Sequence, residues 1–188
     1  MVGYDFDKTI YDGDSSTNFL IFFLFRRPYM LLFLPWLACV ALLYLLKILS
    51  KKKAKELYFF FIPWHKNVDK LVEKFWDKNW KKIYPWYKNQ QKNDDVILSA
   101  SLDFVFVPAM KRLGVTNFDC THYDLKTGKI VGNNCYGEEK VERFKKMFGE
   151  KTLEAFYSDS MSDLPMMNIS KKKFLVEKKI PHEIEKEN

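Results

Sequence analysis

The sequence predicts an α/β fold, in which a mostly parallel sheet is flanked by helices and a helical cap is inserted after the first strand. Short apolar segments alternate with helical patterns from residue 93 onward, which predicts the sheet. Between the first strand and residue 93 the patterns are helical only, which predicts the cap. We therefore expect a core formed by residues 1–13 and 93–188, and a cap at 14–92.

Each core segment has its own signal. The strand VGYDF is cut off by the polar run YDGDSST, and the helical pattern LDFVFVPAMKRLG stops at Gly114. The segment EEKVERFKKMFG is an amphipathic helix pattern. The expected strands are 2–6, 96–100, 153–159 and 173–177, with a hairpin or two short strands at 118–132, and the expected helices are 102–114, 138–149 and 163–169.

The cap contains the most apolar part of the chain. Residues 19–49 are interrupted only by Arg26-Arg27-Pro28 and Pro35, and 29–46 is an uncharged run of 18 residues, the lower limit for a membrane span. Residues 51–92 combine lysines with apolar residues at three-to-four spacing, which predicts helices. Pro63 and Pro85 are expected to divide this part into two or three helices.

Charge is concentrated in one segment. The net charge is +7, and residues 51–92 alone hold twelve lysines and four acidic residues. The excess of positive charge therefore belongs to this one segment and not to the protein as a whole. The three cysteines are odd in number and widely spaced, which argues against a disulfide framework and a zinc site and suits a reducing compartment. No secretory signal is expected, because the first apolar run begins only at Phe19, behind four aspartates.

Polar side chains suited to one reaction follow three of the predicted strands. Ligands of an open parallel sheet bind outside the carboxyl ends of its strands, so we expect these side chains to meet. Carboxylates packed together raise one another's pKa values, and Mg²⁺ with oxygen ligands relieves that repulsion. Together, the polar side chains at the strand ends and the nearby lysine supply what cleavage of a phosphate ester needs: a nucleophile, an acid and positive charge. The candidates at the strand ends are Asp5, Asp7, Thr9, Ser99, Asp159 and Asp163, and Lys140 lies between the second and third of these strands, near the start of a predicted helix.

Four segments in the same order resemble the four motifs of the haloacid dehalogenase (HAD) superfamily of phosphohydrolases. They are DFDKT, LSAS, GEEKV and YSDSMSDLP, and together they span the chain from Asp5 to Pro165. The resemblance implies a HAD-like, Rossmann-like parallel sheet and a phosphatase that forms an aspartyl-phosphate intermediate.

The resemblance also implies the catalytic and metal-binding roles. Asp5 is then the nucleophile, and Asp7 protonates the leaving oxygen and afterwards activates water. Mg²⁺ is held by a carboxylate oxygen of Asp5, the backbone carbonyl of Asp7 and the side chain of Asp159. Asp163 supports the metal site from behind these ligands.

Phosphate binding falls to three other residues in this family pattern. Ser99 and Lys140 hold the phosphoryl group, and Thr9 orients the loop at the phosphate. One departure is Lys8, because members of the family usually have glycine after the second aspartate. The departure bears on the local backbone and on the approach of phosphate, and it removes no catalytic group.

The helical cap resembles that of the phosphoserine phosphatase-like branch of the superfamily. Within that branch, the run TGKIVGNNCYGEEKVERF and the apolar cap resemble the phosphatidylglycerophosphatase C group. Members of that group act on a lipid phosphate at the bacterial inner membrane. The resemblance therefore implies a lipid or amphiphilic phosphate monoester, similar to phosphatidylglycerophosphate, as the substrate.

The length of the apolar segment limits how it meets a membrane. As a helix, residues 19–49 would cross a hydrocarbon layer of ~30 Å once. A single crossing is excluded if the site forms, because Asp5 precedes the segment while Ser99 and Asp159 follow it. The segment must therefore re-enter or lie flat. Positive flanks at Arg26-Arg27 and 47–53 favour the cytoplasmic side of the cell membrane.

Alternatives remain open at this point. The basic-aromatic segment 51–92 suits the headgroup layer of a membrane, and nucleic acid is not expected beside an acidic site. A soluble, cytoplasmic enzyme of the phosphoserine phosphatase kind, acting on a small polar substrate, is one alternative. A membrane-anchored HAD-fold module that binds without catalysis is another.

Overall fold

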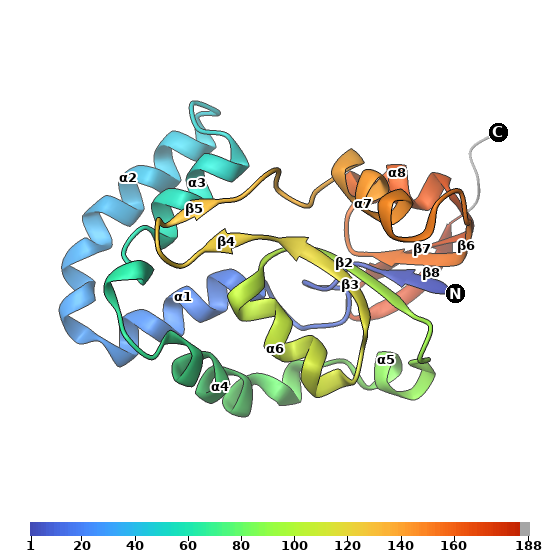
Figure 1. Ribbon diagram of the computed structural model, residues 1–188, viewed down its shortest axis with the longest axis horizontal. Coiled ribbons are helices and arrows are strands. Elements are labelled where there is room, and N and C mark those ends of the chain that lie inside the picture. The colour runs from blue at the N-terminus through green and yellow to red at the C-terminus, as the bar shows by residue number, and fades with distance from the viewer. Residues whose placement is uncertain (185–188) are drawn as a thin grey trace.

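The computed structural model describes residues 1–184 and has the expected α/β architecture, a six-stranded sheet with helices around it (Figure 1). The strands are β1 Val2–Tyr4, β2 Val96–Leu102, β3 Asn117–Thr121, β6 Leu153–Ser158, β7 Ser170–Glu177 and β8 Ile180–Ile184. Their order is β3-β2-β1-β6-β7-β8, and every neighbouring pair is parallel except β7 with β8. The first strand of the chain therefore lies inside the sheet, between β2 and β6.

Three helices follow core strands as the sequence predicts. They are α6 Asp103–Leu113, α7 Glu138–Phe148 and α8 Leu164–Asn168. Gly114 ends α6 in the left-handed region at φ +71°, where a residue without a Cβ atom is favoured. Alternate residues of β2 face opposite sides, because Val96 and Leu98 pack with residues of α7 and α8 while Ile97 packs in the larger core cluster around α6.

The insertion forms a series of helices joined by short turns. They are α1 Ser15–Arg26, the 3₁₀ turn Pro28–Phe33, α2 Leu34–Leu45, α3 Lys51–Phe59, α4 Val68–Asn79 and α5 Pro85–Gln90. Asp14 and Ser50 cap α1 and α3, accepting hydrogen bonds from the backbone N–H groups of Thr17 and Lys53. As predicted, the helices of 51–92 are interrupted near Pro63 and Pro85.

Two sequence expectations differ from the structure near the sheet edges. The segment 118–132, expected as a hairpin or two short strands, contributes to three strands, because β3 joins the main sheet while β4 Tyr123–Asp124 and β5 Lys129–Ile130 pair as a hairpin. Strand β8 was not expected at all. Its connection to β7 is a two-residue turn of Lys178 and Lys179, both at positive φ, in place of the usual Asn-Gly signal.

The cap and the core share one apolar cluster. Cap residues Phe19, Phe59 and Phe75 belong to the same buried set as the core residues Phe6 and Ile97. Helices α1, α2 and α3 lie at one end of the molecule, whereas α4 and α5 return beneath α6 and the sheet (Figure 1). The insertion 14–92 therefore supplies both the cap and part of the core packing.

The β4–β5 hairpin supports α3 from the core side. The hydroxyl of Tyr123 donates to the carbonyl of Phe59 at 2.7 Å, and the backbone N–H of Ile130 donates to Glu56 Oε1 at 3.1 Å. Glu56 is buried and forms ion pairs with Lys53 and Lys129. These contacts fix the position of α3 relative to the core.

Trp76 of α4 is a fully buried apolar link between the insertion and the core. It is fully buried against Phe6 and Tyr11, and its Nε1–H donates to the carbonyl of Val105 in α6 at 2.8 Å. We expect Trp76→Ala to lower the free energy of unfolding by about 3–5 kcal/mol, because it leaves a large cavity.

Urea unfolding followed by circular dichroism would measure this loss. Trp64→Ala is the matched control, because Trp64 is 64% exposed and its removal should change the unfolding free energy by only about 0.5 kcal/mol. Equal losses in the two variants would contradict the assigned role of Trp76.

Candidate active site

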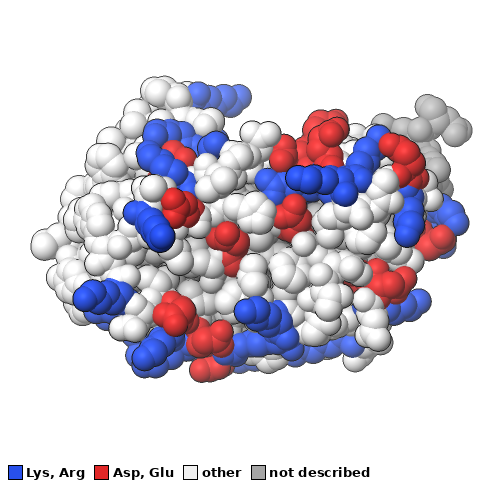
Figure 2. All heavy atoms as spheres, in the orientation of Figure 1, with Lys and Arg blue, Asp and Glu red and all other residues white. Residues whose placement is uncertain are grey.

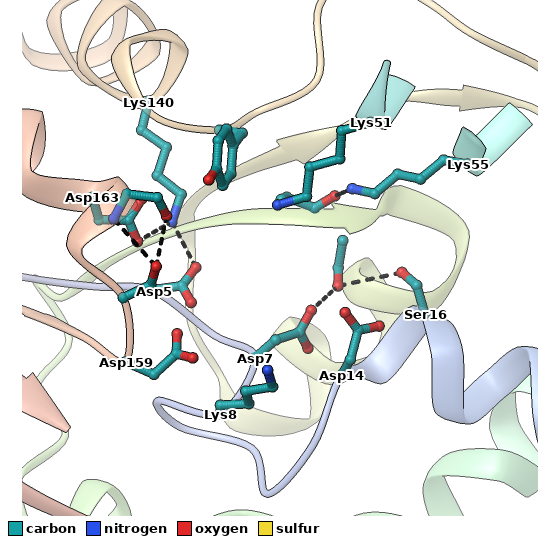
Figure 3. A pocket seen from close by; sticks show the side chains of 15 residues that line it. Asp5, Asp7, Lys8, Asp14, Ser16, Lys51, Lys55, Lys140, Asp159 and Asp163 are labelled. Carbon is teal, nitrogen blue, oxygen red and sulfur yellow. Dashed lines mark hydrogen bonds and ion pairs between the residues drawn. The ribbon is translucent and has the colours of Figure 1, made fainter. Parts of the chain in front are cut away.

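A cavity of about 190 Å³ opens at the carboxyl ends of β1 and β6, beside the end of β2 (Figure 3). Five of the residues singled out from the sequence line it: Asp5, Asp7, Lys140, Asp159 and Asp163. They come from the loop after β1, from α7 and from the segment after β6. The convergence expected from the sequence is therefore present.

Lys140 ties two of the carboxylates together. Its side chain is buried, and its ammonium donates to Asp5 Oδ1 at 2.6 Å and to Asp163 Oδ2 at 2.7 Å (Figure 3). Ser158, the last residue of β6, also donates to Asp163 Oδ2 at 2.7 Å. These hydrogen bonds orient Asp5 toward the cavity and leave its second oxygen free of Lys140.

The positive charge of Lys140 does not fully balance the negative charges of Asp5 and Asp163. Burial, with help from Asp163 and Asp7, raises the pKa of Asp5 to about 7, although Lys140 opposes the rise. Burial acts to lower the pKa of Lys140, but the Asp5 and Asp163 carboxylates outweigh it and raise that pKa. Lys140 therefore stays protonated, and one ammonium faces two buried carboxylates.

Asp7 is held by the start of α1 and the end of β2. Its Oδ1 accepts a hydrogen bond from the backbone N–H of Ser15 at 2.8 Å, and its Oδ2 accepts one from the Ser101 hydroxyl. Burial, followed by the nearby Asp14 carboxylate, raises the pKa of Asp7 to about 6. A carboxyl group with a raised pKa is suited to give and take a proton near neutral pH.

Lys8 lies in the loop between β1 and α1, where its backbone conformation is one that glycine usually adopts. Its φ is +58°, in the left-handed region that favours glycine, so the glycine usual in the family fits this backbone. The Lys8 side chain lines the cavity, and its charge opposes the rise that burial imposes on the pKa of Asp159. Thr9 is buried and accepts the backbone N–H of Asp159 at 2.9 Å, which joins the two loops.

The end of β2 places two serines differently. Ser99 is fully buried, and its hydroxyl accepts the backbone N–H of Ser101 at 3.0 Å. It is Ser101, two residues later, that lines the cavity and contacts Asp7. A register shift between Ser99 and Leu102 produces this arrangement. The sequence pattern pointed to Ser99 and not to Ser101, because an irregularity within a strand does not change the apolar pattern.

The carboxylates of the cavity fit a magnesium ion. Asp163 Oδ1 is buried without a hydrogen-bond partner in residues 1–184, and Asp5 and Asp159 add further oxygens. Within the same residues, no three carboxylate, imidazole or thiol groups form a ready-made metal cage. Mg²⁺ binds through one or two carboxylates, completed by water and phosphate, so this open set suits it.

The cap contributes residues that the sequence analysis did not assign to the site. Lys51 and Lys55 of α3 reach into the cavity from the side opposite Asp5, and Ser16 and Asp14 line it from the start of α1 (Figure 3). The four-residue spacing of Lys51 and Lys55, which places both side chains on one face of a helix, was the sequence signal that could have assigned them to the site. It was hidden in a segment where lysine is common.

Comparison with known proteins agrees with this geometry. The family model described as haloacid dehalogenase-like hydrolase matches residues 2–168. Protein CicA of Caulobacter vibrioides (strain NA1000 / CB15N) is 34% identical over 84 residues, which cover 42% of this chain and 38% of CicA. A probable phosphatase of Mycobacterium tuberculosis (strain ATCC 25618 / H37Rv) is 35% identical over 81 residues, 39% of this chain and 28% of that protein.

Solved structures share the fold at low sequence identity. A protein of unknown function from Bordetella pertussis Tohama I has a TM-score of 0.77 at 19% identity, covering 92% of this chain and 87% of that one. A phosphoserine phosphohydrolase-like protein from Francisella tularensis has a TM-score of 0.57 at 14% identity, covering 95% and 88%. With its motifs gathered in one cavity and the family model spanning nearly its full length, the chain belongs to the haloacid dehalogenase-like hydrolase family.

Proposed function

We propose that this chain is a Mg²⁺-dependent phosphatase that hydrolyses a lipid or amphiphilic phosphate monoester at a membrane surface, through an aspartyl-phosphate on Asp5. Phosphatase chemistry follows from the family and from the site. The lipid or amphiphilic substrate and the membrane surface are supported by one observation. The active-site cavity lies directly beneath a cap whose outer face is apolar and exposed. An enzyme built for small polar substrates has no need for that face.

The chain's own residues supply most of the reaction. Asp5, oriented by Lys140, attacks the phosphorus atom while Asp7 gives a proton to the leaving oxygen. Asp7 then takes a proton from the water that attacks the aspartyl-phosphate, which returns both carboxyl groups to their starting state. Mg²⁺, held by Asp5, Asp159 and the backbone carbonyl of Asp7, would neutralise charge on the phosphoryl oxygens.

The apolar face of the cap supports a membrane surface as the place of action. Twelve of the twenty exposed large apolar side chains in the described chain lie within residues 21–48, and Phe25, Leu32 and Leu45 are 74%, 83% and 76% exposed. Residues Pro28–Leu45 form a helical stretch apolar and long enough to span a membrane, yet only 17% of it is buried. A soluble helix normally buries its apolar side.

The charges around this face suit an anionic membrane. Figure 2 shows the end of the molecule formed by α1 and α2 as largely uncharged, with lysine and arginine side chains at its borders. Arg26 and Arg27 precede the apolar stretch, and Lys47 follows it. Because α1 and α3 both lead back to the core, the stretch would lie in the headgroup layer or re-enter, on one side of the membrane.

Replacement of the nucleophile tests the chemistry. We expect Asp5→Asn to lower Mg²⁺-dependent hydrolysis of 4-nitrophenyl phosphate by roughly three orders of magnitude or more, because an amide cannot form the phosphoenzyme. Release of 4-nitrophenol measures the rate. Asp69→Asn, an exposed carboxylate in the first turn of α4, is the control and should keep full activity. Undiminished hydrolysis by Asp5→Asn would show that the reaction does not proceed through an aspartyl-phosphate on Asp5.

Thermal unfolding tests the metal site. We expect saturating MgCl₂ to raise the melting temperature by about 5 °C or more, because the ion binds only the folded carboxylate cluster. Asp159→Asn should reduce this shift, whereas Asp69→Asn should preserve it. Differential scanning fluorimetry with and without MgCl₂ gives the values. An identical shift in Asp159→Asn and wild type would remove Asp159 from the proposed ligand set.

Vesicle flotation tests the membrane surface. We expect the double change Leu42→Asp and Leu46→Asp to lower the fraction bound to anionic vesicles by about tenfold or more, because each carboxylate resists entry into the apolar layer. Both side chains are exposed on the cap. The matched control changes Met147 and Ile180 to Asp. Both are exposed apolar residues that lie outside the cap. Equal binding of the wild type and the Leu42 and Leu46 variant would contradict membrane contact through this face, and absence of binding by the wild type would favour the soluble enzyme.

A further inference from the structure

The active-site cavity continues into a second space beneath the cap. A groove of about 390 Å³ lies between α1, α2 and α3, and it shares Asp14, Ser16, Lys51 and Lys55 with the catalytic cavity. Beyond these shared residues its walls are mostly apolar and aromatic, formed by Leu20, Ala54, Tyr58, Phe59 and Tyr44 of α2, with Thr17 as the remaining polar residue. A leaving group attached to phosphate at Asp5 therefore has a path into this groove.

Two ammonium groups stand at the junction of the two spaces. Lys51 and Lys55 are one helical turn apart on α3, so their side chains share a face and reach toward the catalytic carboxylates (Figure 3). Burial, followed by the charge of Lys51, lowers the pKa of Lys55 to about 8, although the Asp14 and Asp7 carboxylates oppose the fall. Two like charges in a confined space destabilise each other unless an anion lies between them.

The present partners of these lysines leave room for an anion. Lys55 Nζ donates to Asn134 Oδ1 at 2.7 Å and to the carbonyl of Ala100, which accounts for two of its three hydrogens. The ammonium of Lys51 lies 3.6 Å from the centre of the Tyr136 ring and forms no ion pair with residues 1–184. Asp14, the carboxylate at the junction, accepts the backbone N–H of Thr17.

The reacting phosphoryl group does not require these lysines. Lys140 and the proposed Mg²⁺ already provide positive charge next to Asp5. We propose that Lys51 and Lys55 form a second anion-binding subsite, which holds an anionic group on the leaving portion of the substrate, while the apolar remainder lies in the adjoining groove. This rests on the proposed function only in treating the ligand as a phosphate monoester. The substrate class is a monoester whose leaving alcohol carries a carboxylate or a phosphodiester.

Binding to the Asp5→Asn protein tests the subsite without turnover. Two ligand pairs differ in the second anion: 3-phosphoglycerate against glycerol 3-phosphate, and phosphatidylglycerophosphate against phosphatidic acid in matched micelles. Isothermal titration calorimetry in MgCl₂ gives each dissociation constant. We expect the member with the second anion to bind about tenfold more tightly in at least one pair, the contribution of one hydrogen bond to a charged group.

Variants of the lysines identify the cause of the preference. In the Asp5→Asn background, Lys51→Gln should bring the two members of a pair to within about twofold, and Lys51→Arg should restore the preference. Lys53→Gln, on the same helix but outside both spaces, should leave it unchanged. A preference in the lipid pair alone identifies a lipid headgroup, and one in both pairs shows that the anion itself is recognised.

Two results would overturn the subsite. One is equal affinity within both pairs, and the other is a preference that survives Lys51→Gln. Hydrolysis of 4-nitrophenyl phosphate by the wild-type protein is measured separately. If that hydrolysis is absent while the Lys51-dependent preference persists, the proposed phosphatase function fails and the subsite stands.

Discussion

Lys140 joins parts of the chain that are far apart in sequence, and the site depends on this contact. Its buried ammonium binds Asp5, which follows β1, and Asp163, which follows β6. Burying several carboxylates together is costly unless positive charge accompanies them, so Lys140 makes the cluster tolerable. It balances only part of the charge. The remaining negative charge, together with Asp163 Oδ1, which has no hydrogen-bond partner within residues 1–184, is what a bound cation would neutralise.

The order of the strands follows from the same requirement. Because β1 lies between β2 and β6, the loops after these three strands meet at one edge of the sheet. The insertion begins at residue 14, shortly after the loop that carries Asp7, so its first helix lies against the site and the backbone N–H of Ser15 donates to Asp7. The cap is thereby coupled to the catalytic loop, and residues of α3 that are distant in sequence face Asp5 across the cavity.

The cap has two faces with opposite demands. Its inner face packs on the core through side chains such as Phe19, Phe59 and Phe75. Its outer face keeps Leu32, Leu45 and other apolar side chains in contact with solvent, which a protein free in water has reason to avoid. The groove shares residues with the cavity and is also lined by Tyr44 of α2, the helix bearing that face. The substrate proposed above, with a charged head and an apolar tail, would contact both the cavity and the groove.

The sequence by itself determined the α/β class, the inserted helices and most of the site, because apolar periodicity and polar residues at strand ends are local signals. Asp5, Asp7, Asp159 and Asp163 were identifiable for that reason, and Lys140 by its place near the start of an amphipathic helix. Only the tertiary structure placed Ser101 at the cavity and Ser99 behind it, added β8, and brought Lys51 and Lys55 opposite Asp5. A bulge, a lysine turn and the docking of a helix depend on contacts between distant segments, which no local pattern encodes.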